Sequence, residues 1–473
     1  MIRSRRFVES LAAKQEAVYG VTTGVGRLST ERIEPGAARQ VQINLLRSHA
    51  CGVGEPLGAN ETRGMLLLRA NGLATGLSGV RPLVAERLCE FLNRGLLPVV
   101  PSRGSVGASG DLAPLAHLGL PLIGEGEVVY RGRRMAAAVA LERAHLKPLT
   151  LEAKEGLALV NGTEAMLALG LLALREAEIL VDTADVAGAL SLDALRGSPV
   201  AFDPRFGSAR PHPGQRVTAN HLLRLNHGSS IRKSHRNCAR VQDAYSLRCM
   251  PQVHGAVRDA LAFAARTFEI EMNSVTDNPL VFAEEGEILS GGNFHGQPLA
   301  TALDLMAIAL AQLGSISERR IDRMVNPSVS ELPAFLAESP GVESGFMLAQ
   351  VTAAALASEN KILAHPASVD SIPTSGGKED FVSMGMAAAL KLRSVIVNAG
   401  EILAIELLAA RRALEFLAPL ETGRLAARAL DRVRAAAPAA RGDRSLSGDI
   451  MRLAERVRAG EIAAILSRTG GGR

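Results

Sequence analysis

Apolar residues recur every three to four positions through most of this chain, which is the spacing of an amphipathic or buried helix. The longest patterns predict helices over residues 152–187, 253–271, 297–320, 344–363 and 378–417. In the last pattern the apolar residues form two neighbouring stripes, one through Ile402 and Ile405 and the other through Leu403 and Leu407. Together they are wider than a single core-facing stripe, so we expect a helix inside a bundle. The predicted fold class is mainly α.

Short β-hairpins and helix breaks complete the predicted elements. Alternating apolar and polar residues predict one hairpin near residues 127–133 and a second at 280–282 and 287–289. Helical spacing between residues 61 and 94 is broken at Gly79 and Pro82. These strands are too few to form a main sheet, so the hairpins should be minor additions to the helices.

Composition narrows the classes of function. The chain has 473 residues, of which 47% are hydrophobic, enough to bury a large core. Its net charge is +5, but aromatic residues make up only 3%, so it offers little for stacking on nucleic-acid bases. The four cysteines are too scattered for a disulfide scaffold or a metal site. The apolar runs at 156–174 and 299–313 contain polar residues and should be buried helices. We therefore expect a cytoplasmic protein that binds no metal, nucleic acid or membrane.

Residues 104–114 contain the tripeptide Ala108-Ser109-Gly110 between a glycine-rich loop and a predicted helix start. Asp111 is predicted to cap a helix over 112–118. Such a stretch is most often a capped turn and nothing more. Its chemistry allows more, because attack of the Gly110 amide nitrogen on the Ala108 carbonyl, with dehydration of Ser109, would make an electrophilic alkene from the backbone.

Several other polar residues stand in apolar surroundings, and each has an ordinary structural explanation. Tyr19 lies in a loop with glycines that lacks the lysine and Ser/Thr of a phosphate loop. His49 and Asn161, taken alone, are typical of hydrogen-bonded structural residues. Tyr245 and Arg248 would share one face of a helix, and this arginine suits either a carboxylate ligand or an internal salt bridge.

The sequence Gly-Ala-Ser-Gly-Asp-Leu-Ala-Pro-Leu-Ala at residues 107–116 resembles the signature of the aromatic amino acid ammonia-lyases, and its histidine branch in particular. In that family the Ala-Ser-Gly tripeptide forms methylidene-imidazolone (MIO). Further motifs agree with the family in order and spacing, at residues 210–215, 242–255 and 368–375. The resemblance runs from Tyr19 almost to the end of the chain.

The resemblance implies a role for each scattered polar residue. Tyr19 would be the base that removes the substrate's β-proton, and Arg248 would bind the α-carboxylate. Asn161 would help to hold MIO and the substrate, while Gln242 and Tyr245 would line the reacting face.

Two further residues would serve the prosthetic group, since Phe294 would pack beside it and Asp111 would help to form or hold it. Substrate choice would depend on His49, Met347 and Glu379, because their counterparts in the histidine branch face the imidazole ring or pack near it. Hydrogen-bonding side chains there would be costly against a phenyl ring. The implied reaction is the non-oxidative deamination of L-histidine to trans-urocanate and ammonia, in histidine degradation.

The resemblance also implies the architecture and assembly. We expect a long-helix bundle of the ammonia-lyase and fumarase type, with an N-terminal domain at 1–215 that carries the Tyr19 and Ala-Ser-Gly loops and a C-terminal bundle domain at 216–473. MIO from Ala108-Ser109-Gly110 would be the prosthetic group, without a metal or dissociable cofactor. The assembly would be a homotetramer with active sites shared between subunits.

The sequence departs from the pattern of the histidine branch at a few positions, namely Thr22, Val25, Glu164, Lys378 and Phe381. These keep two alternatives open: another MIO enzyme, such as a phenylalanine or tyrosine ammonia-lyase or a 2,3-aminomutase, and an inactive relative that only binds or assembles. Without the resemblance, Ser109 could belong to a serine hydrolase, but Gly-Ala-Ser-Gly does not fit the G-x-S-x-G elbow.

Overall fold

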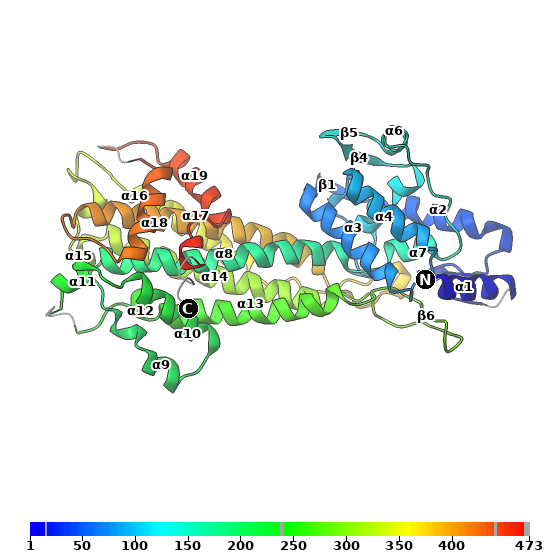
Figure 1. Ribbon diagram of the computed structural model, residues 1–473, viewed down its shortest axis with the longest axis horizontal. Helices are drawn as coiled ribbons and strands as arrows, with labels where there is room; N and C mark the ends of the chain where they lie inside the picture. The colour runs from blue at the N-terminus through cyan, green and yellow to red at the C-terminus, as the bar shows by residue number, and fades with distance from the viewer. Residues whose placement is uncertain (15–16, 237–240, 439–441, 468–473) are drawn as a thin grey trace, which may run out of the picture. The chain divides into compact units, whose positions relative to one another are not determined.

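The computed structural model describes residues 1–14, 17–236, 241–438 and 442–467, and most of them are helical (Figure 1). The chain divides into two compact units, and each unit is built from three chain segments. The first unit comprises Met1–Leu172, Ala265–Asp304 and Pro366–Leu390, and the second comprises Ala173–Ala264, Leu305–His365 and Lys391–Arg473. The first unit contains both the Tyr19 loop and the Ala-Ser-Gly loop. The domain boundary expected at residue 215 stays a prediction.

Four long helices carry residues of both units. They are α8 (Glu164–Ala194), α13 (Met250–Met272), α14 (Gln297–Val325) and α17 (Gly385–Glu415). The chain passes from one unit to the other within each of these helices. Long helices were predicted in all four regions, and the mainly α fold class is confirmed.

The first unit also contains shorter helices. These are α1 (Ile2–Lys14), α2 (Ala38–His49), α3 (Ala59–Ala74), α4 (Pro82–Arg94), α5 (Ala113–Gly119), α6 (Ala137–Arg143) and α7 (Glu155–Val160), with 3-10 turns at Gly26–Leu28, Pro35–Ala37, Leu120–Ile123 and Ser375–Gly377. Helices α3 and α4 pack side by side (Figure 1). Pro82 starts α4, where its missing N–H costs nothing, and Gly95 ends it in a left-handed conformation.

Short antiparallel strands accompany these helices in the first unit. They are β1 (Val53–Pro56), β2 (Leu97–Pro98), β3 (Pro101–Arg103), β4 (Glu127–Tyr130), β5 (Arg133–Ala136), β6 (Leu280–Phe282) and β7 (Glu287–Leu289). Strand β1 pairs with β3, β4 lies between β2 and β5, and β6 pairs with β7. Both predicted hairpins are therefore confirmed, with Tyr130 opposite Arg133 in the first and Phe282 opposite Glu287 in the second.

Two of the errors in the predicted helix bounds fall beside the site. The pattern at 152–187 is two helices, because the chain breaks between α7 and α8 at residues 161–163. The pattern at 378–417 becomes helical only at Gly385, since Glu379 pairs with Thr374 in an isolated bridge and Met384 has a φ of +55°. Apolar periodicity continued through both segments, although local contacts hold their backbones out of the helix.

The second unit adds further short helices. They are α9 (Pro204–Ala209), α10 (Pro213–Leu225), α11 (Ser230–Ser234), α12 (Tyr245–Arg248), α15 (Pro327–Ser330), α16 (Met347–Leu363), α18 (Arg424–Ala436), α19 (Ser447–Arg458) and α20 (Ala464–Ser467), with 3-10 turns at Pro199–Phe202 and Ala334–Leu336. Ile402 and Ile405 of α17 join a buried cluster with α16, and Leu403 and Leu407 are buried too. Both predicted stripes of α17 are thus covered. Among the described residues, only α14 is long and apolar enough to cross a membrane, and most of it is buried within the protein.

Candidate active site

A cavity of about 510 Å³ in the first unit brings together six of the predicted site residues. They are Tyr19, His49, Ser109, Asn161, Phe294 and Glu379. This volume lies within the range of small-molecule sites. The structure therefore gathers the predicted base Tyr19, the serine of the Ala-Ser-Gly tripeptide and two of the three residues predicted to select the substrate around one space.

The Ala-Ser-Gly loop is a tight bend pressed against the break between α7 and α8. Gly110 has a φ of +73°, which favours glycine, and it forms a bridge with Gly162. A Cβ at Gly110 would overlap the Gly162 carbonyl group. The next N–H, that of Asp111, donates to the same carbonyl oxygen at 2.7 Å. Glycine is thus required at position 110 by both backbone angle and space.

Asp111 caps a different helix from the one that we predicted. Helix α5 begins at Ala113 without a side-chain cap, so a cap on residues 112–118 is wrong. Instead, the buried Asp111 carboxylate accepts hydrogen bonds from the N–H groups of Ala165, at 2.6 Å, and Met166, at 3.3 Å. These belong to the first turn of α8. Burial, reinforced by the negative charge of Glu164, holds the pKa of Asp111 well above its usual value, while both N–H bonds oppose this rise.

The phenol oxygen of Tyr19 accepts a hydrogen bond from the backbone N–H of Gly26 at 3.0 Å. Backbone bonds across the loop, such as Ile33 N–H to Thr22 O at 2.9 Å, hold this turn in place. Burial and the charge of Glu379 raise the pKa of Tyr19, and the Gly26 N–H lowers it. This N–H is consequently the local group that favours the phenolate.

Glu379 and His49 present polar groups to the same cavity. The Ser109 hydroxyl donates to Glu379 Oε1 at 3.4 Å, and the Thr374 hydroxyl holds Glu379 Oε2 at 2.7 Å. His49 ends α2, and its Nδ1 shares a hydrogen bond of 3.1 Å with Ser48 Oγ. Burial lowers the pKa of His49, which favours the neutral form of the ring. A neutral imidazole can donate to or accept from a polar ring, and a carboxylate can accept a hydrogen bond from it.

Asn161 lies on the cavity wall, and Asp277 and Asn278 accept hydrogen bonds from its side-chain amide group. Its Nδ2 donates to Asp277 Oδ1 at 3.3 Å and to the Asn278 carbonyl oxygen at 3.0 Å. Asp277 pairs in turn with Lys154 at 2.7 Å. The sequence analysis missed Lys154, Asp277 and Asn278, although the polar run Thr276-Asp277-Asn278 shortly after the end of a long helix was a usable signal.

The remaining predicted residues, Gln242, Tyr245, Arg248 and Met347, belong to the second unit, and none of them lines this cavity. Tyr245 and Arg248 share a face of α12 as expected, with the guanidinium 4.6 Å from the ring centre. Tyr245 is 71% exposed, and Gln242 is exposed as well. Met347 begins α16 and is half-buried.

Three of the departures from the histidine pattern have clear positions. Lys378 and Val25 line the cavity, together with Arg27, a cation that the sequence analysis did not single out. Phe381 is 63% exposed and stacks on His295, with ring centres 6.1 Å apart. The cavity wall therefore carries two cations that can influence an anionic substrate.

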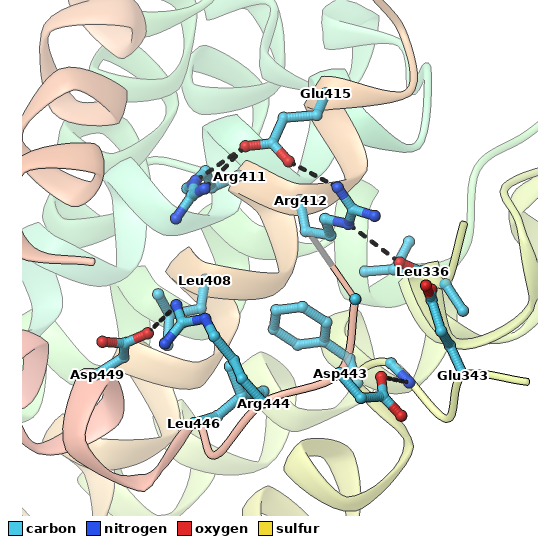
Figure 2. Close-up of a pocket in the computed structure, with 14 residues that line it drawn as sticks. Leu336, Glu343, Leu408, Arg411, Arg412, Glu415, Asp443, Arg444, Leu446 and Asp449 are labelled. Atoms are coloured by element: carbon cyan, nitrogen blue, oxygen red, sulfur yellow. Dashed lines mark hydrogen bonds and ion pairs between the residues drawn. The ribbon is translucent and has the colours of Figure 1, made fainter. Parts of the chain in front are cut away.

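Two other features of the second unit resemble binding sites. Asp182, Asp185 and His221 lie within metal-binding distance of one another, but the Arg258 guanidinium bonds both carboxylates, at 2.8 and 2.5 Å, and already supplies the positive charge. A cavity of about 60 Å³ is lined by charged side chains that pair among themselves (Figure 2). There Arg411 and Arg412 both bond Glu415, and Arg444 bonds Asp449. Neither feature contains a predicted site residue.

The chain is similar to known proteins along nearly its whole length. The profile of the family described as aromatic amino acid lyase matches residues 1–435. The chain is 58% identical to a histidine ammonia-lyase of Koribacter versatilis, over 98% of this chain and 92% of that protein.

Solved structures show the same likeness. The histidine ammonia-lyase of Trypanosoma cruzi superposes with a TM-score of 0.91 at 41% identity, over 98% of this chain and 88% of that one. The tyrosine aminomutase of Streptomyces globisporus gives 0.93 at 40% identity, over 99% and 93%. Since the family profile and the relatives both cover nearly all of the chain, this protein belongs to the aromatic amino acid lyase family.

Proposed function

We propose that this protein is a histidine ammonia-lyase that converts L-histidine to trans-urocanate and ammonia. The observation that carries the proposal is the placement of His49 and Glu379 on the cavity that also holds Tyr19 and Ser109. An imidazole ring can donate a hydrogen bond to the Glu379 carboxylate and exchange one with His49, whereas a phenyl ring can do neither. The names of the similar histidine ammonia-lyases support the same substrate.

The Ala108-Ser109-Gly110 loop fits the prosthetic group MIO. Cyclisation needs a tight bend without a side chain at its third residue, and Gly110 meets this requirement through its positive φ and its contact with Gly162. Asp111 anchors the end of the bend on α8. When formed, MIO supplies an electrophilic alkene that makes the substrate's amino group a better leaving group.

Tyr19 is the proposed base that removes the β-proton of histidine. A phenol with a raised pKa is a stronger base once deprotonated, and the Gly26 N–H bond offsets part of the cost of the phenolate. His49 and Glu379 would fix the imidazole ring so that the β-carbon faces Tyr19. Arg248, by its bidentate guanidinium, would hold the carboxylate.

A homotetramer with shared active sites is the proposed assembly, in which another copy supplies Gln242, Tyr245, Arg248 and Met347. In its support, helix α16, which begins at Met347, leaves several apolar side chains uncovered: Leu348 is 61% exposed, Val351 50% and Ile362 67%. An apolar face of this kind is typical of an interface between subunits. The cytoplasm is the proposed compartment, and the free thiols of Cys51, Cys89 and Cys249 are compatible with it.

The test is ultraviolet absorbance of the purified protein with L-histidine, L-tyrosine and L-phenylalanine in separate reactions. Urocanate should form from histidine alone, and the Ser109→Ala variant should form none. Ser102→Ala, which changes a serine of β3 away from the cavity, is the matched control and should stay active. Product from tyrosine or phenylalanine instead would contradict the substrate, and a β-amino acid product would indicate an aminomutase. No product from any of the three amino acids, together with an intact mass that shows unreacted Ser109, would indicate an inactive relative.

A further inference from the structure

The buried ion pair of Lys154 and Asp277 lies directly behind the cavity wall and takes no part in the proposed reaction. Lys154 and Asp277 are 0% and 1% exposed, and the Lys154 ammonium contacts Asp277 Oδ2 at 2.7 Å. Burying two charges is costly, and such a pair adds little stability compared with apolar residues of the same size. Stability therefore does not account for this pair, which indicates another purpose.

The second oxygen of Asp277 points to that purpose. Asp277 Oδ1 accepts one N–H from the side chain of Asn161, at 3.3 Å, and the backbone N–H of Asn278, at 2.7 Å. The Asn278 carbonyl oxygen accepts from the same Asn161 nitrogen at 3.0 Å. Both partners of this nitrogen can only accept, so the orientation of the Asn161 amide is fixed by chemistry.

This arrangement leaves one atom of Asn161 for a ligand. Asn161 lines the cavity, and its Oδ1 is buried without a hydrogen-bond partner among the described residues. A buried carbonyl oxygen without a donor is costly unless a ligand supplies one. Asn278 also supports another part of the cavity wall, because its Oδ1 accepts from the Gly291 N–H at 2.8 Å in the loop that leads to Phe294.

The geometry points to Lys154 and Asp277 as positioning residues that hold Asn161 Oδ1 as the acceptor for the substrate's α-amino group. This inference rests on the proposed function. Histidine carries N–H donors only on its α-amino group and its imidazole ring, and the ring is assigned to His49 and Glu379. The carboxylate of the substrate has no proton to donate at neutral pH. The amino group is then the donor that matches a lone carbonyl oxygen.

The test compares two ligands that differ only in the amino group. Binding of L-histidine and of imidazolepropionate, which lacks the amino group, is measured by calorimetry in a Ser109→Ala background, where no turnover occurs. The double variant Lys154→Met/Asp277→Leu removes both charges together, so no unpaired charge is left buried. It should weaken L-histidine binding by about 10- to 100-fold, the value of one hydrogen bond to a charged group, and leave imidazolepropionate within about 2-fold.

Two further variants test whether the change in binding comes from misfolding or from a general effect of removing a buried charge. Asn161→Ala leaves the ion pair intact and should give the same selective loss. Asp193→Asn, at a buried carboxylate of the second unit bonded to Ser229 and Thr422, is the matched control and should change neither ligand. Equal weakening of both ligands, or of neither, would overturn the inference while the proposed function stands. Failure of both ligands to bind even with the ion pair intact would overturn the proposed function and this inference with it.

Discussion

The two units of this chain hold their predicted site residues in different ways. In the first unit, Tyr19, Asp111 and Asn161 are each fixed by hydrogen bonds to backbone groups. In the second unit, Tyr245 is 71% exposed and lies against Arg248 on a helix of only four residues. The difference indicates that the first unit holds its predicted site residues in fixed positions, whereas in the second unit Tyr245 is exposed and Arg248 is half-buried.

The largest effect is expected from the base in the first unit. Tyr19→Phe should lower kcat by ~10² to 10⁴-fold with little change in KM, because proton removal loses its base while substrate contacts remain. Steady-state urocanate formation measures this. Tyr130→Phe, at a buried tyrosine in strand β4, should leave both constants unchanged. A kcat for Tyr19→Phe close to that of the unchanged protein would contradict the proposed role of Tyr19 as the base.

A smaller effect of a different kind is expected in the second unit. Arg248→Gln should raise KM for L-histidine by about 10- to 100-fold with a weaker effect on kcat, since a charge-assisted grip on the carboxylate is lost. Arg319→Gln, which changes an exposed arginine of α14 that pairs with Glu318, serves as the control. An unchanged KM for Arg248→Gln would show that the cations of the first unit, Arg27 and Lys378, bind the carboxylate instead.

The charge of Glu379 should appear in the pH profile. Glu379 raises the pKa of Tyr19, and the base works only when it is deprotonated, so activity should rise with pH towards that pKa. Glu379→Gln removes the negative charge and so lowers the pKa of Tyr19. The pH at which kcat/KM rises should therefore be lower, while the maximum value of kcat/KM falls. Asp380→Asn, next in sequence and outside the cavity lining, should leave that pH unchanged. A shift towards higher pH would contradict the assigned coupling.

The smallest expected effect concerns the stability of the first unit. Asp111→Ala should lower the free energy of unfolding by about 1 to 2 kcal/mol, because the first turn of α8 loses its acceptor. Burial raises the pKa of the Asp111 carboxyl group in the folded protein. Its contribution to the free energy of unfolding is therefore full below its pKa in the unfolded chain, and it is lost as pH rises through its higher pKa in the folded protein. Because Asn keeps an acceptor oxygen, Asp111→Asn should cost less than Asp111→Ala at neutral pH. Denaturant unfolding of both variants at pH 5 and pH 8 measures these losses. The loss for Asp111→Ala should be smaller at pH 8 than at pH 5, and equal losses for the two variants would contradict the capping role.

Periodicity and local turn signals predicted the parts of the fold that depend on neighbours in sequence. The two stripes of α17 and both β-hairpins follow from apolar spacing alone. The start of α17 at Gly385 does not, because the bridge of Thr374 with Glu379 overrides a helical pattern.

Contacts between distant segments set the limit of the sequence analysis at the site. Asp111 caps α8 more than fifty residues further along the chain, and Lys154 meets Asp277 across a separation of 123 residues. Neither partner can be identified from spacing in one sequence. The six predicted site residues among those that line the cavity were identified through family motifs, because a motif shared by a family reflects such distant contacts.

The measurement that tests the central claim most directly is complementation between two inactive variants. Ser109→Ala removes the serine of the first unit from which MIO is proposed to form. Arg248→Ala removes the guanidinium of the second unit that is proposed to bind the substrate's carboxylate. If different copies supply these two halves of one site, tetramers reassembled from an equal mixture should recover about a quarter of the native urocanate-forming activity, since random assembly unites two intact halves in that share of sites. Activity that stays at the level of the separate variants, in mixed tetramers verified by mass, would contradict the account.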